Sequence, residues 1–409
     1  MAKILVLSEL YYPEQTSTGY FLTEIAEGLA QKYDVQAVVG PPTRFLKKTQ
    51  APSYDLRNKV KIFRCRGTNF DKNILLGRLA NVLTQSLTIF WKALKLCNQE
   101  DCILVVTNPP LLPFLALFIK WLKRCQLVLL VHDVYPEVLA ATEICQSSSI
   151  VFRLGQAANR LLYNCSDRII TLGRDMSRLA LQKLEKAKMG KIYCIPNWAD
   201  TNLVYPLDRE NNPILQSLRI TGRFIILYAG NLGRTHGIEY LAEAAKHLKD
   251  DPKFHFIVMG SGAKKRWLEE YVQQEKLQSV TILPSCERSQ LNTLLNAGDI
   301  ALISFIPGMA GVSVPSRMYN QMAAGKAIIA ISDDWSELAE VVHEDNIGWV
   351  VSPGDITRLV EVIKLAESDR ELNHAMGIKA AKVAQDKYEF SQTDKAYKAL
   401  FDEILSNCP

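Results

Sequence analysis

The segment 314–327 combines a Pro-Ser pair, a cationic residue and a terminal Gly, in the order Val-Pro-Ser-Arg-Met-Tyr-Asn-Gln-Met-Ala-Ala-Gly-Lys-Ala. Pro favours the first turn of a helix and Gly favours the position just past its end, so the segment predicts a short helix. Ser316 is placed to cap the first backbone N–H groups, and free N–H groups at a helix start can bind phosphate. Arg317 adds a permanent positive charge. The pattern suits a bound diphosphate, although an ordinary capped helix would share it.

Glycine-containing or polar segments also follow four apolar runs that are typical of buried strands. They are residues 12–20, 130–137, 228–237 and 259–264. Glycine allows a backbone to approach a ligand closely, so these turns are candidates for a binding site. None of them forms a complete G-x-G-x-x-G or a P-loop, which makes a nicotinamide-dependent enzyme or an ATPase a weak interpretation.

His132 ends one of these apolar runs, in the sequence Leu-Val-His-Asp-Val-Tyr-Pro-Glu (130–137). Ligands of open α/β sheets bind beyond the carboxyl ends of the strands, where this histidine would lie. A structural histidine satisfied within the core is the alternative, and both interpretations remain open.

Short apolar strands alternate with amphipathic helices along the whole chain of 409 residues. The predicted strands are 3–7, 35–39, 61–64, 102–107, 126–132, 168–171, 192–195, 224–229, 255–259, 280–283, 300–303, 327–331 and 348–351. Nearly continuous Val/Ile/Leu strands between helices predict parallel sheets covered on both faces. Two sets of similar size predict an α/β chain of two Rossmann-like domains, 1–205 and 206–387, joined through a polar linker at 196–223. We expect the two domains to face each other, so that the strand-end loops place the site in the cleft between them.

Composition excludes several classes of protein. A hydrophobic content of 48% with 22% charged residues is that of a globular chain. No apolar run is long enough to span a membrane, and the first residues do not resemble a secretion signal. The nine Cys are scattered without a C-x-x-C pair, so we expect reduced thiols and a cytoplasmic protein. No cluster of residues has metal-ligand spacing, so we expect no metal site.

The net charge of +5 hides an asymmetry between the two halves. Residues 1–205 contain 26 Lys and Arg against 16 Asp and Glu, whereas residues 206–409 contain 22 against 27. A basic half indicates an anionic partner, either nucleic acid or a phospholipid surface. Segment 111–124 is apolar and ends in basic residues beside a Trp, which favours the membrane over nucleic acid. A buried crossover helix with a charged end is the alternative.

Taken together, these motifs resemble the retaining GT-B glycosyltransferases of family 4, also called group 1, and cover nearly the whole chain. The resemblance is greatest to bacterial exopolysaccharide and O-antigen enzymes of the colanic-acid type and extends to cyanobacterial envelope-polysaccharide enzymes. It is carried by Tyr-Tyr-Pro-Glu (11–14) with Gly19, the block 132–137, Ile-Pro-Asn-Trp (195–198), the segment 228–233 with His236 and Gly237, and the helix 315–325.

The resemblance implies an acceptor site on the N-terminal domain and a nucleotide-sugar site on the C-terminal domain, with a last helix at 388–409 that crosses back to the first domain. It places His132 against the donor sugar and Gly19 near the donor phosphate and the acceptor. The donor-binding residues that it implies, with the turn at Gly260 included, are Gly230, Asn231, Arg234, Pro284, Ser285, Ser313, Val314, Ser316, Arg317 and Asn320.

The chain departs from the family pattern at several of these positions. Asn231 stands where many members carry Arg, and His236 stands roughly where they carry Lys. Two Glu that many members have eight residues apart are replaced by Val312 and Asn320. An amide hydrogen-bonds a ribose more weakly than a carboxylate does. Arg234 or Arg317 could supply the lost positive charge.

The implied reaction is metal-independent transfer, with retention, of a hexose or N-acetylhexosamine from a UDP-sugar to a lipid-linked saccharide at the inner membrane face. No Asp-x-Asp is present to hold a divalent ion, and no cofactor besides the donor is expected. Arg317 and the helix start would stabilise the leaving diphosphate. Glu14 could orient the acceptor hydroxyl or could be a surface charge. A UDP-sugar epimerase and a non-catalytic nucleotide-sugar-binding protein are the alternatives.

Overall fold

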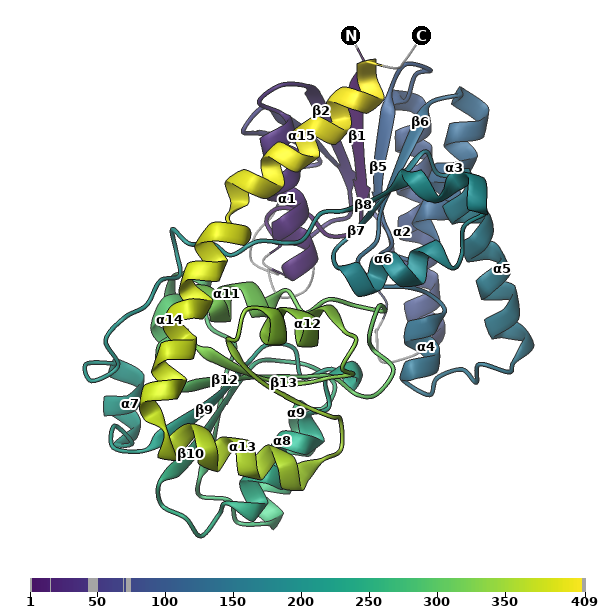
Figure 1. Cartoon of the computed structure of the whole chain (residues 1–409). Helices are drawn as coiled ribbons and strands as arrows, with labels where there is room; N and C mark the ends of the chain where they lie inside the picture. Colours follow the sequence, from purple (N-terminus) through teal and green to yellow (C-terminus); the bar gives the residue numbers. More distant parts are fainter. Residues whose placement is uncertain (1, 15, 43–50, 69, 71–74, 407–409) are drawn as a thin grey trace. The chain divides into compact units, whose positions relative to one another are not determined.

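The computed structural model describes residues 2–14, 16–42, 51–68, 70 and 75–406, and within them the chain forms two compact units (Figure 1). The first unit groups residues 1–140, 145–196 and 391–409, and the second groups residues 141–144 and 197–390. The division therefore falls after Pro196, before the boundary at 205 that we expected from the sequence. Residues 407–409 of the expected crossing helix lie outside the described residues.

In the described part of the first unit, an eight-stranded sheet has the order β3-β4-β2-β1-β5-β6-β7-β8. The strands are β1 (Lys3–Ser8), β2 (Asp34–Val39), β3 (Tyr54–Arg57), β4 (Val60–Arg64), β5 (Cys102–Val106), β6 (Gln126–Leu130), β7 (Arg168–Thr171) and β8 (Ile192–Cys194). All neighbours are parallel except β3 and β4. The sequence did not predict β3, because its half-exposed residues lack the apolar run of the central strands.

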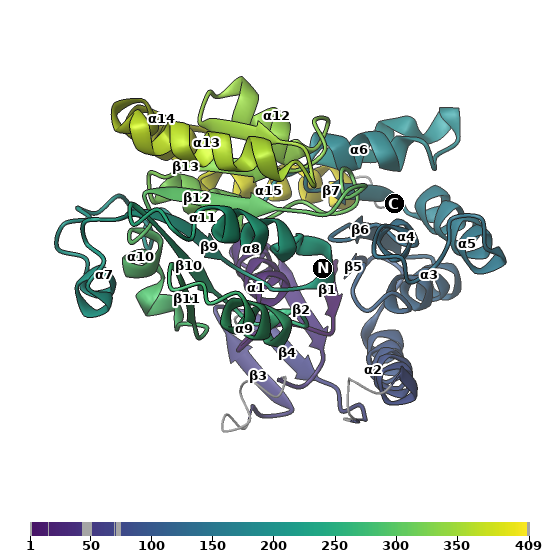
Figure 2. The ribbon, with the colours of Figure 1, turned by 90° about the horizontal axis from the view of Figure 1, so that it is seen from below.

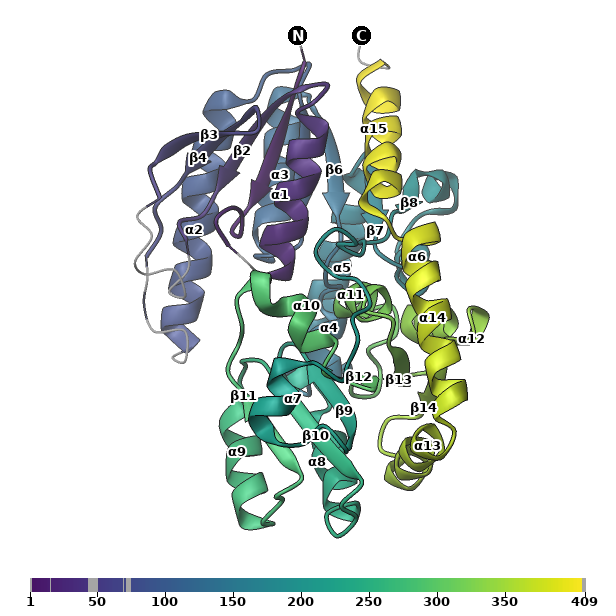
Figure 3. The ribbon, with the colours of Figure 1, turned by 90° about the vertical axis from the view of Figure 1, so that its left-hand side faces the viewer.

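Helices cover both faces of this sheet. They are α1 (Ser17–Leu29), α2 (Leu75–Leu96), α3 (Leu112–Lys123), α4 (Glu137–Ala141), α5 (Ile150–Cys165), α6 (Arg174–Leu181) and α15 (Phe390–Ser406). Viewed along the strands, α1 and α15 lie on one side, and α2, α3 and α5 lie on the other (Figure 2). Asp402 of α15 pairs with Lys32 at 2.5 Å, and Glu403 pairs with Arg168 at 2.6 Å, so the last helix runs alongside the first unit (Figure 3).

The described second unit contains a parallel six-stranded sheet in the order β11-β10-β9-β12-β13-β14. Its strands are β9 (Phe224–Ala229), β10 (Phe254–Met259), β11 (Val280–Leu283), β12 (Ile300–Ser304), β13 (Ala327–Ile331) and β14 (Gly348–Val351). The order reverses between β9 and β12, as in doubly wound folds. The strands β9, β10, β12 and β13 are buried along their whole length, which explains their continuous apolar sequences.

Two apolar cores flank this second sheet. One face packs against α8 (Ile238–His247), α9 (Lys265–Gln274) and α13 (Ile356–Ser368), and the other against α7 (Pro213–Leu218), α10 (Leu291–Leu295), α11 (Arg317–Ala323), α12 (Glu337–Glu344) and α14 (Arg370–Lys387). Leu215 of α7 and Ile220 belong to the core on the face covered by α7, α10, α11, α12 and α14. The expected linker at 196–223 is therefore wrong over most of its length, because this segment packs as part of the second unit.

Candidate functional site

Two loops at the carboxyl ends of β9 and β10 form the floor of the candidate site in the second unit. Backbone hydrogen bonds join them, from Gly230 N to Met259 O (2.9 Å) and from Leu232 N to Ser261 O (2.9 Å). A Cβ atom at position 260 would lie 1.8 Å from the carbonyl oxygen of Gly230, so only glycine allows this approach. The two predicted turns, at Gly230 and Gly260, thus pack directly against each other.

Arg317, at the start of α11, reaches over this floor. Its guanidinium carbon lies 4.7 Å from the centre of the Tyr228 ring, and its Nη2 donates to the carbonyl oxygen of Ser304 at 3.1 Å. A Cβ at Gly230 would meet Nη1 at 2.6 Å, so the guanidinium lies directly against this loop. Nη1 is buried and has no hydrogen-bond partner among the described residues. A buried, unpaired cationic donor needs an acceptor, and a bound anion would supply one.

His236, at the end of the 3-10 turn η3 (Arg234–His236), lies in the same group. Its Nδ1 is 2.9 Å from the hydroxyl of Thr235, and its ring packs on Phe305 with centroids 5.4 Å apart. Burial, together with the positive charges of Arg317 and Lys264, lowers the pKa of His236 to about 2. His236 is therefore neutral and does not replace the lysine charge of the family pattern, whereas Arg317 supplies a permanent positive charge beside these loops.

Two predicted donor residues, Ser316 and Asn320, lie in or next to α11. Ser316 precedes α11 in a helical conformation, and within the described chain its side chain makes no capping hydrogen bond. The predicted Ser316 cap is therefore wrong, because the chain already turns one residue earlier, where Met318 N donates to the Pro315 oxygen at 3.0 Å. Asn320 Oδ1 accepts from Asp200 N at 3.1 Å, so this oxygen anchors the segment entering the second unit.

The other predicted donor residues lie on loops of the second unit. Asn231 is exposed and lies near Gly262, where its Oδ1 would be 2.7 Å from an added Cβ. Pro284 and Ser285 are exposed just after β11, at the same end of the sheet as Gly230 and Gly260. Arg234 lies in η3, and Ser313 and Val314 lie between β12 and α11.

In the first unit, His132 follows β6 and is nearly buried, with an exposed fraction of 9%. The hydroxyl of Thr107, which follows β5, accepts from His132 N at 3.1 Å and from Asp133 N at 3.2 Å. Burial lowers the pKa of His132 to about 4, so the imidazole is neutral at physiological pH. Its Nε2 is buried without a hydrogen-bond partner in the described chain. The satisfied structural histidine of the alternative interpretation does not describe this side chain.

Glu14 follows β1, and Gly19 lies in the first turn of α1. Glu14 is 6% exposed, so its interpretation as a surface charge is wrong. A Cβ at Gly19 would lie 2.8 Å from the Cβ of Glu14, which explains the glycine by close packing. The buried Arg64 holds the segment around Glu14 by donating to the Tyr12 carbonyl oxygen at 3.1 Å. The structure therefore fixes the position of Glu14 within the first unit.

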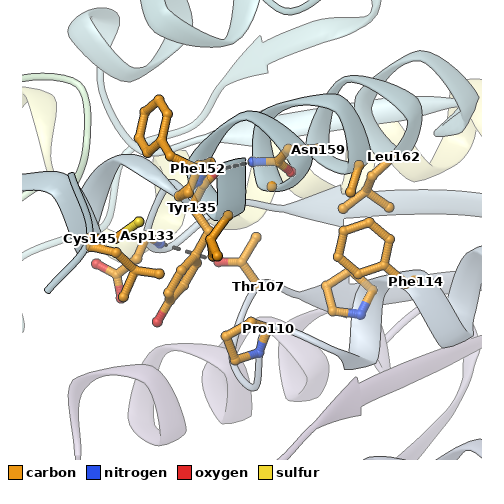
Figure 4. Close-up of a pocket in the computed structure, with 15 residues that line it drawn as sticks. Thr107, Pro110, Phe114, Asp133, Tyr135, Cys145, Phe152, Asn159 and Leu162 are labelled. Carbon is orange, nitrogen blue, oxygen red and sulfur yellow. Dashed lines mark hydrogen bonds between the residues drawn. The ribbon is translucent and has the colours of Figure 1, made fainter. Parts of the chain in front are cut away.

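The His132–Glu137 segment also borders a pocket of about 230 Å³ in the first unit (Figure 4). Most of its walls are apolar, and its polar groups come from Thr107, Asp133, Tyr135 and Asn159. Asn159 Nδ2 donates to the Tyr135 carbonyl oxygen, which ties α5 to the segment after His132. We did not predict this pocket, because its lining residues come from segments far apart in the sequence.

A buried ion pair holds α4 in place behind this segment. Lys183 is 5% exposed and pairs with Glu137, whose Oε1 also accepts from Gln156 Nε2 at 2.8 Å. Removal of one partner leaves the other charge buried and unpaired. We expect Lys183→Met to lower the free energy of unfolding by about 3–5 kcal/mol, measured by denaturant titration. The double variant Lys183→Met/Glu137→Gln should recover part of the loss, and a single-variant effect below about 1 kcal/mol would contradict the importance of the pair.

Three buried histidines predict that acid destabilises the protein. Burial is the main cause that lowers the pKa of His132 and His255 to about 4 and that of His236 to about 2. Below about pH 6.5 these histidines bind protons in the unfolded chain but stay neutral in the folded chain. The free energy of unfolding therefore falls between about pH 6.5 and 4, by roughly 1.4 kcal/mol per pH unit for each histidine. We expect a lower Tm at pH 5 than at pH 7.5, and His255→Gln should reduce the difference. An equal Tm difference between pH 7.5 and pH 5 in the parent protein and in His255→Gln would contradict a contribution of His255.

Neither a metal-binding cluster nor a membrane-spanning helix is present in the part of the chain that the structure describes. Among the described residues, no group of His, Cys, Asp and Glu side chains is arranged to hold a metal ion. No helix in the described ranges combines the length and the apolar character needed to cross a bilayer.

Comparison of the sequence with known proteins links the chain to enzymes of sugar transfer. The family described as "Glycosyl transferases group 1" matches residues 211–383. The chain is 31% identical over 413 residues to "Probable glycosyltransferase WbjE" of Pseudomonas aeruginosa, with 99% of each chain covered. It is 25% identical over 378 residues to "Putative colanic acid biosynthesis glycosyl transferase WcaI" of Escherichia coli (strain K12), with 89% of this chain and 92% of WcaI covered.

Solved structures share the fold at low sequence identity. A sucrose-phosphate synthase from Thermosynechococcus elongatus superposes with a TM-score of 0.78 at 16% identity, covering 99% of this chain and all of the other. Anabaena HepE, solved in complex with UDP and glucose, superposes with a TM-score of 0.74 at 16% identity and the same coverage. The two parallel-sheet units of this chain thus have the GT-B fold.

Proposed function

Because this chain belongs to the group 1 glycosyl transferases, we propose that it moves a hexose or N-acetylhexosamine from a UDP-sugar to a lipid-linked saccharide in the synthesis of a cell-surface polysaccharide. The polysaccharide role follows the naming of WcaI, and the UDP donor follows the ligands of HepE. We further propose that the anomeric configuration is retained and that the protein acts at the cytoplasmic face of the membrane.

The buried Nη1 of Arg317 is the observation that carries the donor assignment. It lies against the Gly230 loop, at the carboxyl ends of β9 and β12, where doubly wound sheets bind ligands. The neutral His236 beside it leaves the guanidinium charge uncompensated within this group. A diphosphate would supply both the missing acceptor and the missing negative charge.

The proposed mechanism depends on charge that develops as the sugar leaves. Cleavage of the bond between the anomeric carbon and the phosphate oxygen places negative charge on the diphosphate. Arg317 and the backbone N–H groups of the neighbouring loops would stabilise that charge without a metal ion. His132, neutral and with its Nε2 unpartnered in the described residues, would hydrogen-bond a hydroxyl of the donor sugar. Glu14 would orient the acceptor hydroxyl.

Calorimetric titration in EDTA tests the donor assignment. We expect UDP and at least one of UDP-glucose, UDP-galactose and UDP-N-acetylglucosamine to bind more tightly than GDP or ADP. Release of UDP that requires an added acceptor supports transfer, whereas epimerisation of the sugar without an acceptor would identify an epimerase. Binding without any turnover of donor, with a range of lipid-linked acceptors, would favour a binding protein.

One face of the first unit supports association with an anionic membrane. The helices α2, α3 and α5 lie side by side (Figure 2), and their sequences contain no Asp or Glu. Their exposed apolar side chains are Leu76, Leu79, Leu83, Leu87, Trp91, Phe118, Trp121, Leu122, Ile150, Val151, Leu154 and Leu161. Lys95, Arg153 and Arg160 are exposed among them, and Arg124 follows α3. Apolar and cationic residues together favour an anionic lipid surface.

The end of α3 offers a test of this association. Lys120 is unsuitable, because it pairs with Asp167 at 2.5 Å. We expect Lys123→Glu/Arg124→Glu to weaken binding to phosphatidylglycerol-containing vesicles by at least about thirtyfold, since each lost cation near an anionic surface contributes about 1 kcal/mol and each new Glu adds repulsion. Flotation of vesicles measures the binding, with the exposed pair Lys276→Glu/Lys249→Glu in the second unit as the control. Equal loss in both variants would argue against this face.

A further inference from the structure

We propose that the pocket beside the His132–Glu137 segment binds the hydrocarbon chain of a lipid-linked acceptor, close to its saccharide. This inference rests on the proposed transfer to a lipid-linked saccharide and adds a defined site for the lipid. The occupant is a hydrocarbon chain that arrives covalently attached to the sugar acceptor.

The size and the walls of the pocket suit a hydrocarbon. Its volume of about 230 Å³ exceeds the ~150 Å³ of an apolar protein cavity that takes up benzene. Its apolar lining residues are Pro110, Pro113, Phe114, Pro136, Leu139, Val151, Phe152, Gly155, Ala158 and Leu162. A sugar ring enclosed by these walls would leave most of its hydroxyls without hydrogen-bond partners, which is costly. Branched or linear hydrocarbon has no such cost and gains from burial.

Two of the polar residues of the pocket, Asp133 and Tyr135, lie on the segment that carries His132. Figure 4 shows Asp133 and Cys145 toward one end of the labelled set, and Phe114 and Leu162 toward the other. Asp133 directly follows His132, and the hydroxyl of Thr107 accepts from the backbone N–H of both residues. A chain bound among the apolar walls would therefore bring its attached saccharide close to His132.

The rim of the pocket continues into the apolar face of α5. Val151 lines the pocket and is 68% exposed, and its neighbours Ile150 and Leu154 are 75% and 65% exposed. These residues belong to the helix face that lacks acidic side chains and that we propose to contact the membrane. A lipid chain leaving the bilayer would thus meet apolar side chains up to the pocket and would not need to cross a polar surface.

The pocket is built before any ligand arrives. Gly155 of α5 packs against Pro136, where an added Cβ would lie 3.2 Å from the proline ring. The Asn159 side chain holds the Tyr135 carbonyl oxygen, so the segment 135–136 forms a fixed wall. A preformed pocket binds its ligand without an additional ordering cost.

Two neighbouring alanines of α5 give a matched pair of variants. Ala158 lines the pocket, whereas Ala157 is exposed and does not. We would titrate the full chain with butyl, hexyl and octyl β-D-glucoside below their micelle concentrations. Affinity should increase by about fourfold per added methylene, which corresponds to the burial of one CH₂ group. Ala158→Leu, which fills the pocket, should weaken octyl glucoside binding at least tenfold, and Ala157→Leu should bind like the parent protein.

Three additional measurements distinguish an acceptor-lipid site from a phospholipid site and from failure of the proposed function. Val151→Asp changes an exposed rim residue and should also weaken octyl glucoside binding, so the test does not depend on the fold of Ala158→Leu. Affinity for phosphatidylglycerol vesicles and for UDP should be unchanged in Ala158→Leu. Loss of vesicle binding by Ala158→Leu would indicate that the pocket takes a phospholipid chain. Absence of UDP binding in the parent protein would refute the proposed function and not the pocket. Affinity that does not depend on chain length, or equal binding by both alanine variants, would overturn the proposal.

Discussion

Arg317→Met should lower kcat/KM for sugar transfer by about 10²–10³, the size of effect seen when one donor to a developing oxyanion is removed. The guanidinium lies against the Gly230 loop, and its buried Nη1 has no acceptor within the described structure. Methionine keeps much of the packing on Tyr228 but removes the charge and the donors. UDP affinity should fall less than kcat/KM, because the diphosphate carries more negative charge in the transition state than in the donor.

Steady-state kinetics combined with UDP titration measures this difference. Arg266→Met is the matched control, since Arg266 is exposed on α9 and pairs with Glu270. Arg317→Lys should give an intermediate rate, because it keeps the charge without the fixed positions of the two Nη groups. A rate within threefold of the parent for Arg317→Met would remove Arg317 from the proposed mechanism.

His132→Ala is the second substitution with a large expected effect. The imidazole is neutral and its buried Nε2 has no partner in the described chain, so its removal breaks no hydrogen bond of the unliganded side chain. We expect kcat to fall at least 10²-fold through loss of one hydrogen bond to the reacting sugar. The donor diphosphate site lies on the other unit, so UDP affinity should change by less than twofold.

The pH profile adds an independent readout for His132. Because burial lowers its pKa to about 4, His132 loses no proton between pH 5.5 and 8, and its protonation predicts no change in rate over this range. Activity would fall through this residue only as the pH approaches about 4. A fall in kcat with an apparent pKa near 6.5 that disappears in His132→Asn would show that His132 ionises as an exposed imidazole does. His255→Gln serves as the control for a buried histidine outside the site.

The sequence by itself determined the class of fold and most of its strands. The central strands β1, β5, β9 and β12 are buried along nearly their whole length, so their uninterrupted apolar residues could be recognised without tertiary information. The motifs also located the strand-end segments around His132, Gly230 and Arg317, because the ends of parallel strands meet at one edge of a sheet.

Only the tertiary structure decided what these residues contact. Ser316 was predicted as a cap, but the backbone turn at Pro315 replaces that cap. The sequence could not show that the side-chain oxygen of Asn320 also accepts a hydrogen bond from Asp200 N. The sequence pattern of His236 could not show that burial, together with the nearby positive charge of Arg317, lowers the pKa of its ring and keeps it neutral. The apolar pocket was not predictable either, since its walls come from segments between Thr107 and Leu162 that meet only after folding. Local patterns report which elements form, whereas charge, burial and cavities depend on neighbours that are distant in the chain.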